Sequence, residues 1–146
     1  MLFGDEHVRR YRETGGGEGY HWNGVTTLIL TTTGRRSGRQ RSKALIFGED
    51  GGRYLVVASN GGSPAHPDWY LNLRKDPEVE VQVRDVRFRA RARTAEGAER
   101  ERLWELMAKI WPAYNDYQRK TDRQIPVVML EAATTGPLGG PGGSPE

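Results

Sequence analysis

Residues 28–43 read Leu-Ile-Leu-Thr-Thr-Thr-Gly-Arg-Arg-Ser-Gly-Arg-Gln-Arg-Ser-Lys, and the rest of the fold can be worked out from this stretch. The apolar and β-branched residues 26–33 predict one strand, and residues 42–47 predict a second strand that pairs with it as a hairpin. Between the strands lie five cations, from Arg35 to Lys43, without a carboxylate. Glycine permits close backbone approach and guanidinium groups match phosphate or carboxylate oxygens, so this basic loop (residues 34–43) predicts an anion site.

The segments that flank the hairpin predict more strands than long helices. Residues 53–59 form an almost continuous apolar run, which indicates a buried, central strand. Residues 79–83 carry valines at odd positions and residues 86–92 carry apolar side chains at even ones, so a turn between antiparallel strands is predicted near Arg84-Asp85. The other predicted elements are helix 68–75, a helix from Glu96 that Pro112 interrupts, a helical piece through Tyr117, and strand 125–130.

Six predicted strands with short connections favour a mainly β (α+β) chain whose antiparallel sheet curls into a barrel. Strand-helix-strand alternation is lacking, which disfavours a Rossmann fold, and the basic loop lacks the following helix that a P-loop or dinucleotide site requires. We expect one domain over residues 26–131. A loosely held polar lead-in with a short helix would occupy residues 1–25, and a disordered Gly/Pro tail residues 132–146.

Composition narrows the function classes. The 146 residues include no cysteine, and His7, His21 and His66 show no metal-ligand spacing, so we expect no metal site. The net charge is +3, and 18 of the 22 cations are arginine, which indicates bidentate anion recognition or a coding bias. The acidic N-terminus and the lack of ~20 consecutive apolar residues predict a cytoplasmic protein, with peripheral membrane contact left open.

Two clusters of large side chains each allow two interpretations. Arginines alternate along residues 87–93, where a solvated sheet face is favoured and a nucleic-acid surface is the alternative. Trp111, Tyr114 and Tyr117 recur at threefold spacing, which fits core packing or an aromatic wall over a planar substrate.

The sequence offers no strong nucleophile with a neighbouring base, and no pair of carboxylates stands out for acid-base work. A second glycine-containing loop, Ser59-Asn60-Gly61-Gly62, follows the apolar run, and antiparallel neighbours place it beside the basic loop. Together the loops supply charge and hydrogen-bond donors with little bulk, which suits a phosphorylated ligand with a flat ring. An enzyme built this way depends on its cofactor for the chemistry.

Four collinear motifs carry a resemblance to a known family. Residues 28–38 strongly resemble the deazaflavin-dependent nitroreductase family of mycobacteria and other actinobacteria, which includes quinone reductases. Residues 58–62, residues 69–73 with Pro77, and residues 114–118 with 121–126 agree with the same family in order and spacing. The match extends over residues 26–131.

The resemblance implies a split β-barrel of the flavin-reductase or FMN-binding type. It implies binding of coenzyme F-420, an 8-hydroxy-5-deazaflavin with a phosphodiester and an oligoglutamate tail, with FMN as the alternative cofactor. The implied activity is hydride delivery from reduced F-420 to a small electron-poor acceptor: a quinone, nitroaromatic or activated enone. A non-catalytic binder of F-420, FMN or haem, and more remotely a nucleic-acid-binding protein, are the alternatives. Barrels of this type are often homodimers.

The resemblance also implies site residues by position-to-position matching. The residues matched to F-420 binding are Arg35, Arg36, Ser37, Arg41, Lys43, Ala44, Ser59, Asn60, Gly61, Gly62, Trp69 and Asn72. The first four would meet the phosphate and tail, and Lys43 and Ala44 would lie beside the ring. Tyr114, Tyr117 and Ser59 are implied on the catalytic side. The chain departs from a family relative at Asn60, where the relative has lysine, and at Trp111, where it has tyrosine.

Overall fold

The structure, a computed structural model, describes residues 1–137. Its elements in chain order are α1 (Gly4–Thr14), β1 (His21–Trp22), β2 (Val25–Thr33), β3 (Gln40–Ile46), β4 (Gly48–Asp50), β5 (Arg53–Val57), the 3-10 turn η1 (Asn60–Gly62), α2 (Asp68–Lys75), β6 (Glu78–Val83), β7 (Val86–Thr94), α3 (Gly97–Ile110), α4 (Ala113–Arg119) and β8 (Val127–Pro137). The expected disordered tail is wrong over residues 132–137, which belong to β8. Its remaining residues, 138–146, lie outside the described part of the chain.

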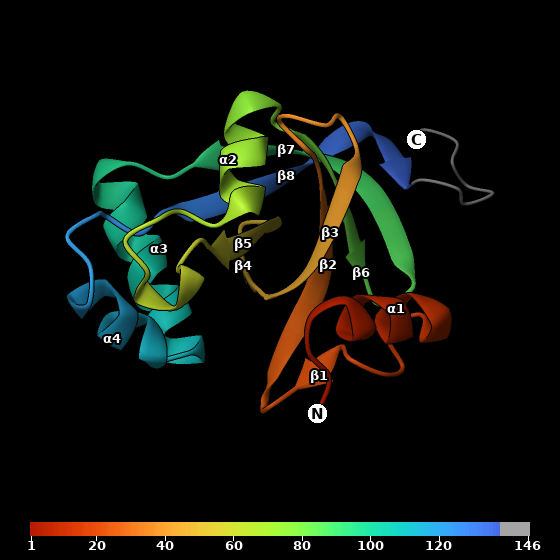
Figure 1. The fold of residues 1–146 in the computed structure, drawn as a ribbon, viewed down its shortest axis with the longest axis horizontal. Helices are drawn as coiled ribbons and strands as arrows, with labels where there is room; N and C mark the ends of the chain where they lie inside the picture. The colour runs from red at the N-terminus through yellow and green to blue at the C-terminus, as the bar shows by residue number, and fades with distance from the viewer. Residues whose placement is uncertain (138–146) are drawn as a thin grey trace.

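All strand pairs are antiparallel, and the sheet order is β1-β2-β6-β7-β8-β5-β4, with β3 on the other side of β2. β3 pairs with β2, and after Phe47 the same stretch of chain pairs with β5 as β4. This crossing joins the two ends of the curled sheet, which bends into a half-closed barrel (Figure 1). The predicted hairpin and antiparallel barrel are confirmed.

Two hydrophobic cores explain why some strands are apolar on both faces. Val56 and Val128 point into the barrel, whereas Leu55 and Met129 point outward against Leu103 of α3. The helices α3 and α4 cover this outer face (Figure 1), so β5 and β8 lose the alternation that an exposed strand would show. Each fully buried aliphatic side chain contributes about 1.5–3 kcal/mol through removal from water.

The predicted central strand at residues 53–59 is buried but not central. β5 spans Arg53–Val57 and lies next to the end of the sheet order. Its inner face is buried in the barrel and its outer face is buried by α3. Two short strands were not predicted, β1 with two residues and β4 with three. Gly48 in β4 lies against α3 so closely that a Cβ there would approach Met107 Sδ to 2.7 Å.

The N-terminal segment is packed onto the sheet rather than loosely held. Tyr11 of α1 is fully buried, and its hydroxyl donates to the Thr27 carbonyl oxygen (2.9 Å) and accepts the Arg84 amide (2.9 Å). Burial raises the pKa of Tyr11 to about 12, so the hydroxyl stays protonated. Among residues 1–137, no helix is both long enough and apolar enough to cross a bilayer.

Candidate functional site

Three adjoining hollows follow one side of the barrel. The anion hollow, about 310 Å³, lies between the basic loop and α2; the central hollow, about 530 Å³, lies beside η1; and the aromatic hollow, about 330 Å³, lies against α4. Lys43, Asp68 and Trp69 line both the anion and central hollows. Leu45, Val57, Ser59 and Gly61 line both the central and aromatic hollows. The three hollows therefore form one continuous groove.

Strand β3 supplies a graded wall to this groove. Arg41, Lys43 and Leu45 alternate along β3 and line the groove in order from the anion hollow to the aromatic hollow. One strand face thus changes from cationic to apolar over five residues. A ligand with an anionic end and a flat apolar end matches that gradient.

Asn72 fixes the start of the basic loop. Its buried side-chain oxygen accepts the Arg35 amide (3.1 Å) and Arg35 Nη1 (2.9 Å), while its nitrogen donates to Thr32 Oγ1 (3.2 Å). Arg35 Nη2 also forms an ion pair with Asp68 Oδ1 at 3.2 Å. Asn72 therefore holds β2, α2 and the loop together behind the hollow.

The other cations of the anion hollow have no partner among residues 1–137. Arg36, Arg41 and Lys43 make no side-chain hydrogen bond or ion pair to any residue within the described range 1–137, and all three are exposed. Ser37 Oγ accepts the Arg39 amide (3.1 Å), which leaves its own proton free to donate. This donor set, three free cations and a hydroxyl, suits a phosphate or carboxylate group.

The conformation of the glycine-containing loop depends on its own backbone angles and on its packing against α4. Asn60 has φ +48° and Gly61 φ +64°, backbone conformations that asparagine and glycine tolerate best. The Asn60 side chain donates to the Ala65 carbonyl (3.0 Å). Gly62 lines none of the three hollows; it lies against α4, where a Cβ would approach the Tyr117 carbonyl oxygen to 2.8 Å.

Arg123 clamps this loop through its main chain. Its guanidinium donates to the carbonyl oxygens of Ser63 (2.9 Å), Ser59 (2.8 Å) and Ala58 (3.3 Å). A fourth bond links Arg123 Nη1 to His66 Nδ1 at 2.9 Å. Because a guanidinium nitrogen donates only, Nδ1 is the acceptor and the neutral ring carries its proton on Nε2. Burial, followed by the charges of Arg123 and Arg74, lowers the pKa of His66 below its ordinary value.

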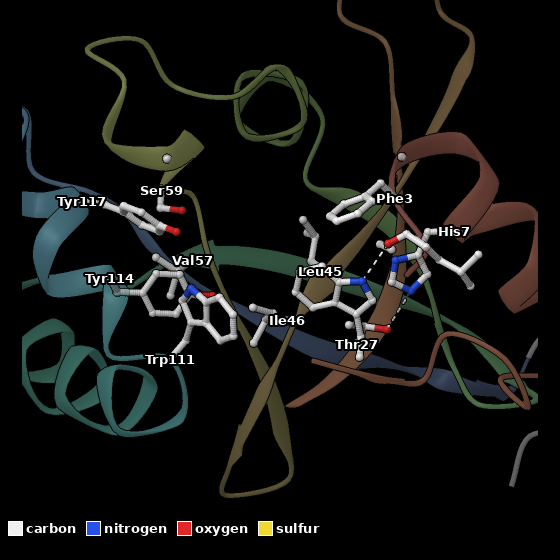
Figure 2. Close-up of a pocket in the computed structure, with 15 residues that line it drawn as sticks. Phe3, His7, Thr27, Leu45, Ile46, Val57, Ser59, Trp111, Tyr114 and Tyr117 are labelled. Atoms are coloured by element: carbon white, nitrogen blue, oxygen red, sulfur yellow. Dashed lines mark hydrogen bonds between the residues drawn. The ribbon is translucent and has the colours of Figure 1, made fainter. Parts of the chain in front are cut away.

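The aromatic hollow gathers side chains from both ends of the chain (Figure 2). Tyr114, Tyr117, Trp111, Val57 and Ser59 lie on one side of it in that view. Burial, with a smaller contribution from Tyr117, raises the pKa of Tyr114 well above its ordinary value, so its hydroxyl remains a donor rather than a base. The expected aromatic wall on α4 does line a hollow, and Tyr114 and Trp111 also pack against the outer core.

The opposite side of the aromatic hollow comes from the N-terminal segment, which the sequence argument had left out. Phe3, His7 and Trp22 line it, and the Trp22 ring lies 6.0 Å from that of Trp111 and 5.8 Å from that of Phe3. Trp22 Nε1 donates to the Leu2 carbonyl (2.7 Å), which fastens the first residues over the hollow. The sequence signal for these site residues is the presence of aromatic residues in an otherwise polar, glycine-rich stretch.

The predicted site residues fall along the groove as follows. Arg35, Arg36, Ser37, Arg41, Lys43, Trp69 and Asn72 line the anion hollow; Lys43, Ser59, Asn60, Gly61 and Trp69 line the central hollow; Ala44, Ser59, Gly61, Tyr114 and Tyr117 line the aromatic hollow. Gly62 is the exception, since it packs behind the loop. Sequence reasoning singled out neither Phe3, His7 and Trp22 nor the loop contacts of Arg123 and His66.

Known proteins share this sequence and architecture. The family model described as F420H(2)-dependent quinone reductase matches residues 4–132. The chain belongs to this family. An F420H(2)-dependent quinone reductase of Mycobacterium tuberculosis is 38% identical over 128 residues, which cover 85% of this chain and 86% of the relative. The family is one of oxidoreductases that use reduced coenzyme F-420, so the predicted cofactor and enzyme class are confirmed.

Solved structures agree with the family assignment. An F420-H2 dependent reductase (FDR-A) superposes with a TM-score of 0.67 at 45% identity and covers 72% of this chain and 93% of that one. A structure described as a domain-swapped dimer superposes with a TM-score of 0.70 at 42% identity and covers 86% and 95%. Two chains at 16% identity, with TM-scores of 0.54 and 0.56, share the split-barrel fold alone.

The groove of this family member fits the cofactor that the family uses. The uncommitted cations of the anion hollow match the phosphate and carboxylate groups of F-420. The Cβ that Gly61 lacks would meet no atom within 4 Å, which leaves room beside the loop for a ligand to approach the backbone. The aromatic hollow, joined to the central one, offers apolar walls for a planar ring or acceptor.

Proposed function

We propose that this chain uses reduced coenzyme F-420 to reduce a quinone. The observation that carries the proposal is the continuous groove, with free cations at one end and aromatic side chains at the other, in a member of a quinone reductase family. The cofactor would lie with its phosphate and tail at the anion hollow and its ring toward the aromatic hollow. Nitroaromatics and activated enones are further electron-poor acceptors.

The residues of the chain would bind and orient, because they include no strong nucleophile. Arg36, Arg41 and Ser37 would hold the phosphate and tail carboxylates, and Arg35 would contribute where Asp68 leaves it free. Lys43 and the Ser59–Gly61 backbone would lie along the middle of the ligand, with Trp69 and Asn72 as support. When bound, reduced F-420 supplies the hydride that, together with one proton, converts a quinone to a quinol.

Proton donation to the acceptor would come from the aromatic hollow. The Tyr114 hydroxyl is held protonated by burial, and Tyr117 and Ser59 place further hydroxyls on the same hollow. A donor fixed beside a carbonyl oxygen stabilises the charge that develops as hydride arrives. Phe3 and Trp22 would exclude water from that reaction.

The proposal also covers the oligomeric state and membrane contact. The domain-swapped dimer among the solved relatives supports a homodimer for this chain as well. Met1 and Phe3 are exposed apolar side chains, and Phe3 lies at the aromatic hollow, which supports peripheral contact with a membrane that holds a lipid quinone. A cytoplasmic location stays a prediction.

The test combines binding with turnover. Micromolar protein should quench the fluorescence of F-420, and reduced F-420 should be oxidised by a soluble quinone faster than without protein. Tyr114→Phe should keep the affinity for F-420 and lower kcat by roughly tenfold or more, since loss of one fixed donor to a developing oxyanion costs on the order of 10²–10³ in kcat. Tight binding without turnover would favour the non-catalytic binder, and FMN or haem absorbance in purified protein would change the cofactor.

A further inference from the structure

His7 is a titratable side chain of the aromatic hollow that the proposed function leaves without a role. It lies on α1, is 4% exposed, and lines the hollow. Figure 2 shows it on the opposite side of the hollow from Tyr114 and Tyr117. Within residues 1–137, the lining of this hollow contains no carboxylate, lysine or arginine. These three side chains are therefore the titratable groups that a ligand in the hollow would meet.

The hydrogen bonds of the His7 ring decide which nitrogen carries the proton. Nε2 lies 2.9 Å from the Gly19 carbonyl oxygen, and a carbonyl oxygen only accepts, so Nε2 is the donor. Thr27 Oγ1 donates to the same carbonyl (2.7 Å) and lies 3.5 Å from Nε2. Nδ1 has no hydrogen-bond partner within residues 1–137. The neutral ring therefore presents the lone pair of Nδ1, and a protonated ring presents an N–H donor there.

The packing around the ring leaves Nδ1 accessible. The fully buried polar side-chain atoms without a partner in the described range are Gln82 Oε1 and Arg100 Nε, so Nδ1 is not sealed inside the core. Gly19 has φ +98°, and a Cβ there would approach His7 Cδ2 to 2.9 Å, so the close approach of this backbone depends on glycine. The Trp22 ring stacks on the imidazole, with centroids 6.2 Å apart. The ring is thus fixed through Nε2 and one face.

We propose that His7 is a catalytic residue that supplies the proton of quinol formation, an inference that rests on the proposed quinone reduction. A quinone has carbonyl oxygens at opposite ends of its ring, and the hollow would meet them with hydroxyls on the α4 side and His7 on the α1 side. Burial raises the pKa of Tyr114, so its hydroxyl donates a hydrogen bond but keeps its proton. A general acid works best when it exchanges its proton near the working pH, as histidine side chains do.

The proposed step uses one hydride and one proton for each quinone. A quinone that accepts a hydride gains two electrons and one proton and becomes the monoanion of the quinol, while reduced F-420 is oxidised. The Nδ1–H bond of the His7 imidazolium breaks, and its proton forms an O–H bond on the anionic oxygen. Nε2 donates to the Gly19 carbonyl in both forms of the ring, so the transfer breaks no hydrogen bond within the protein. The neutral ring regains a proton from water.

The groups around His7 determine the pH dependence. Tyr11, on the same helix, has its ring centroid 6.4 Å away, and Tyr114 and Tyr117 face His7 from α4. Burial raises the pKa of Tyr11 to about 12, so this neighbour stays neutral. Within residues 1–137, the lining residues from β1, β2 and β3 carry no titratable side chain. Because the acid form of His7 is the active one, kcat should fall as the pH rises from about 5 to 8.

His7→Gln tests the proposal, because its amide nitrogen can still donate to the Gly19 carbonyl but exchanges no proton. We expect kcat for a soluble benzoquinone to fall about 10- to 100-fold at about pH 6, with the affinity for F-420 changed less than about twofold. The ratio of parent to variant kcat should shrink toward pH 8, since the parent then loses its acid. Thermal unfolding verifies that the variant is folded.

His21→Gln is the matched control. It makes the same substitution at an exposed position of β1 that lines none of the three hollows, so its kcat should equal that of the parent at every pH. An unchanged kcat in His7→Gln, an equal loss at every pH, or a loss of F-420 affinity alone would show that His7 only supports the fold, and would overturn the inference.

Nitrogen NMR of the parent chain with isotope-labelled histidines gives a second measurement that does not depend on the folding of a variant. We expect His7 to carry its proton on Nε2 and to gain one on Nδ1 as the pH falls from about 8 to 5. A neutral ring with its proton on Nδ1, or no proton uptake in this range, would overturn the inference. Failure of the parent chain to oxidise reduced F-420 with a quinone would instead count against the proposed function, while the NMR result would still decide whether His7 can act as an acid.

Discussion

The basic loop and strand β7 are both rich in arginine, yet their cations have different surroundings. On β7, Arg87 pairs with Glu80, Arg91 with Glu78, and Arg93 with Glu131 and Glu99. In the basic loop, Arg36, Arg41 and Lys43 border a hollow and have no carboxylate partner within residues 1–137. The number of arginines thus says less about binding than the partners they already have.

The cross-strand register explains why β7 is neutralised. Glu78 lies directly opposite Arg91, its ion-pair partner, and Glu80, opposite Arg89, pairs diagonally with Arg87. This pattern supports the favoured interpretation of a solvated sheet face over a nucleic-acid surface. The basic loop joins β2 and β3, and the hairpin gives it no acidic neighbour of that kind.

The largest expected difference between the two regions is in F-420 affinity when cations are removed from each. Arg36→Ala with Arg41→Ala should weaken F-420 binding by on the order of 100-fold, because each charge-assisted bond contributes about 1.5–3 kcal/mol. The matched pair Arg87→Ala with Arg91→Ala should change the affinity less than about twofold, because those two arginines form ion pairs with Glu80 and Glu78. Fluorescence titration measures both. Equal losses would show that bulk charge, and not the hollow, holds the cofactor.

Arg123 represents a third kind of arginine, whose partners are main-chain carbonyls. Arg123→Ala would leave the carbonyl oxygens of Ala58, Ser59 and Ser63 without this donor and should lower the free energy of unfolding by about 2–3 kcal/mol. Denaturant unfolding measures the loss. Arg119→Ala serves as the control, because that side chain is exposed and pairs with Asp116 on the same helix. A loss no larger than that of the control would mean that the clamp is dispensable.

The ion pairs of Asp50 in β4 predict how stability depends on pH. Hydrogen bonds from Arg102 and then Arg53 lower the pKa of Asp50 from 3.8 to about 2. Because the folded-state pKa is the lower one, the stabilisation is complete above the unfolded pKa and is lost as pH falls from about 4 toward 2. Asp50→Asn should therefore unfold at a lower temperature than the parent at pH 5, and the gap should narrow as the pH falls from about 4 toward 2. A gap that is constant with pH would contradict this.

The smallest effect is expected at an exposed pair on the strand. Arg91 and Glu78 are 66% and 61% exposed, so Arg91→Ala should change the free energy of unfolding by less than about 0.5 kcal/mol. Thermal and denaturant unfolding at low and high salt provide the measurement. A loss above about 1 kcal/mol would show that the strand network is stronger than exposed pairs usually are.

Much of the fold followed from local pattern. Periodicity predicted helix 68–75 with its observed ends, the turn at Arg84-Asp85, and the break between α3 and α4 at Pro112. It misplaced β5 as central, because a strand covered by helices on its outer face is as apolar as one in the middle of a sheet. It also missed β1 and β4, which are too short to show a period.

The sequence by itself determined the basic loop, the glycine-containing loop and the tyrosines of α4, since residue type and spacing carry their chemistry. Tertiary structure alone decided which cations are free. Arg35 is held by Asp68 and Asn72 from α2. Three arginines of β7, Arg87, Arg91 and Arg93, are held by glutamates of β6 and β8. Tertiary structure also brought Phe3 to the aromatic hollow opposite Tyr114 (Figure 2) and made Trp22 part of the lining of that hollow. The residue type sets charge and aromaticity, but whether a side chain can contact a ligand depends on which neighbours the fold places beside it.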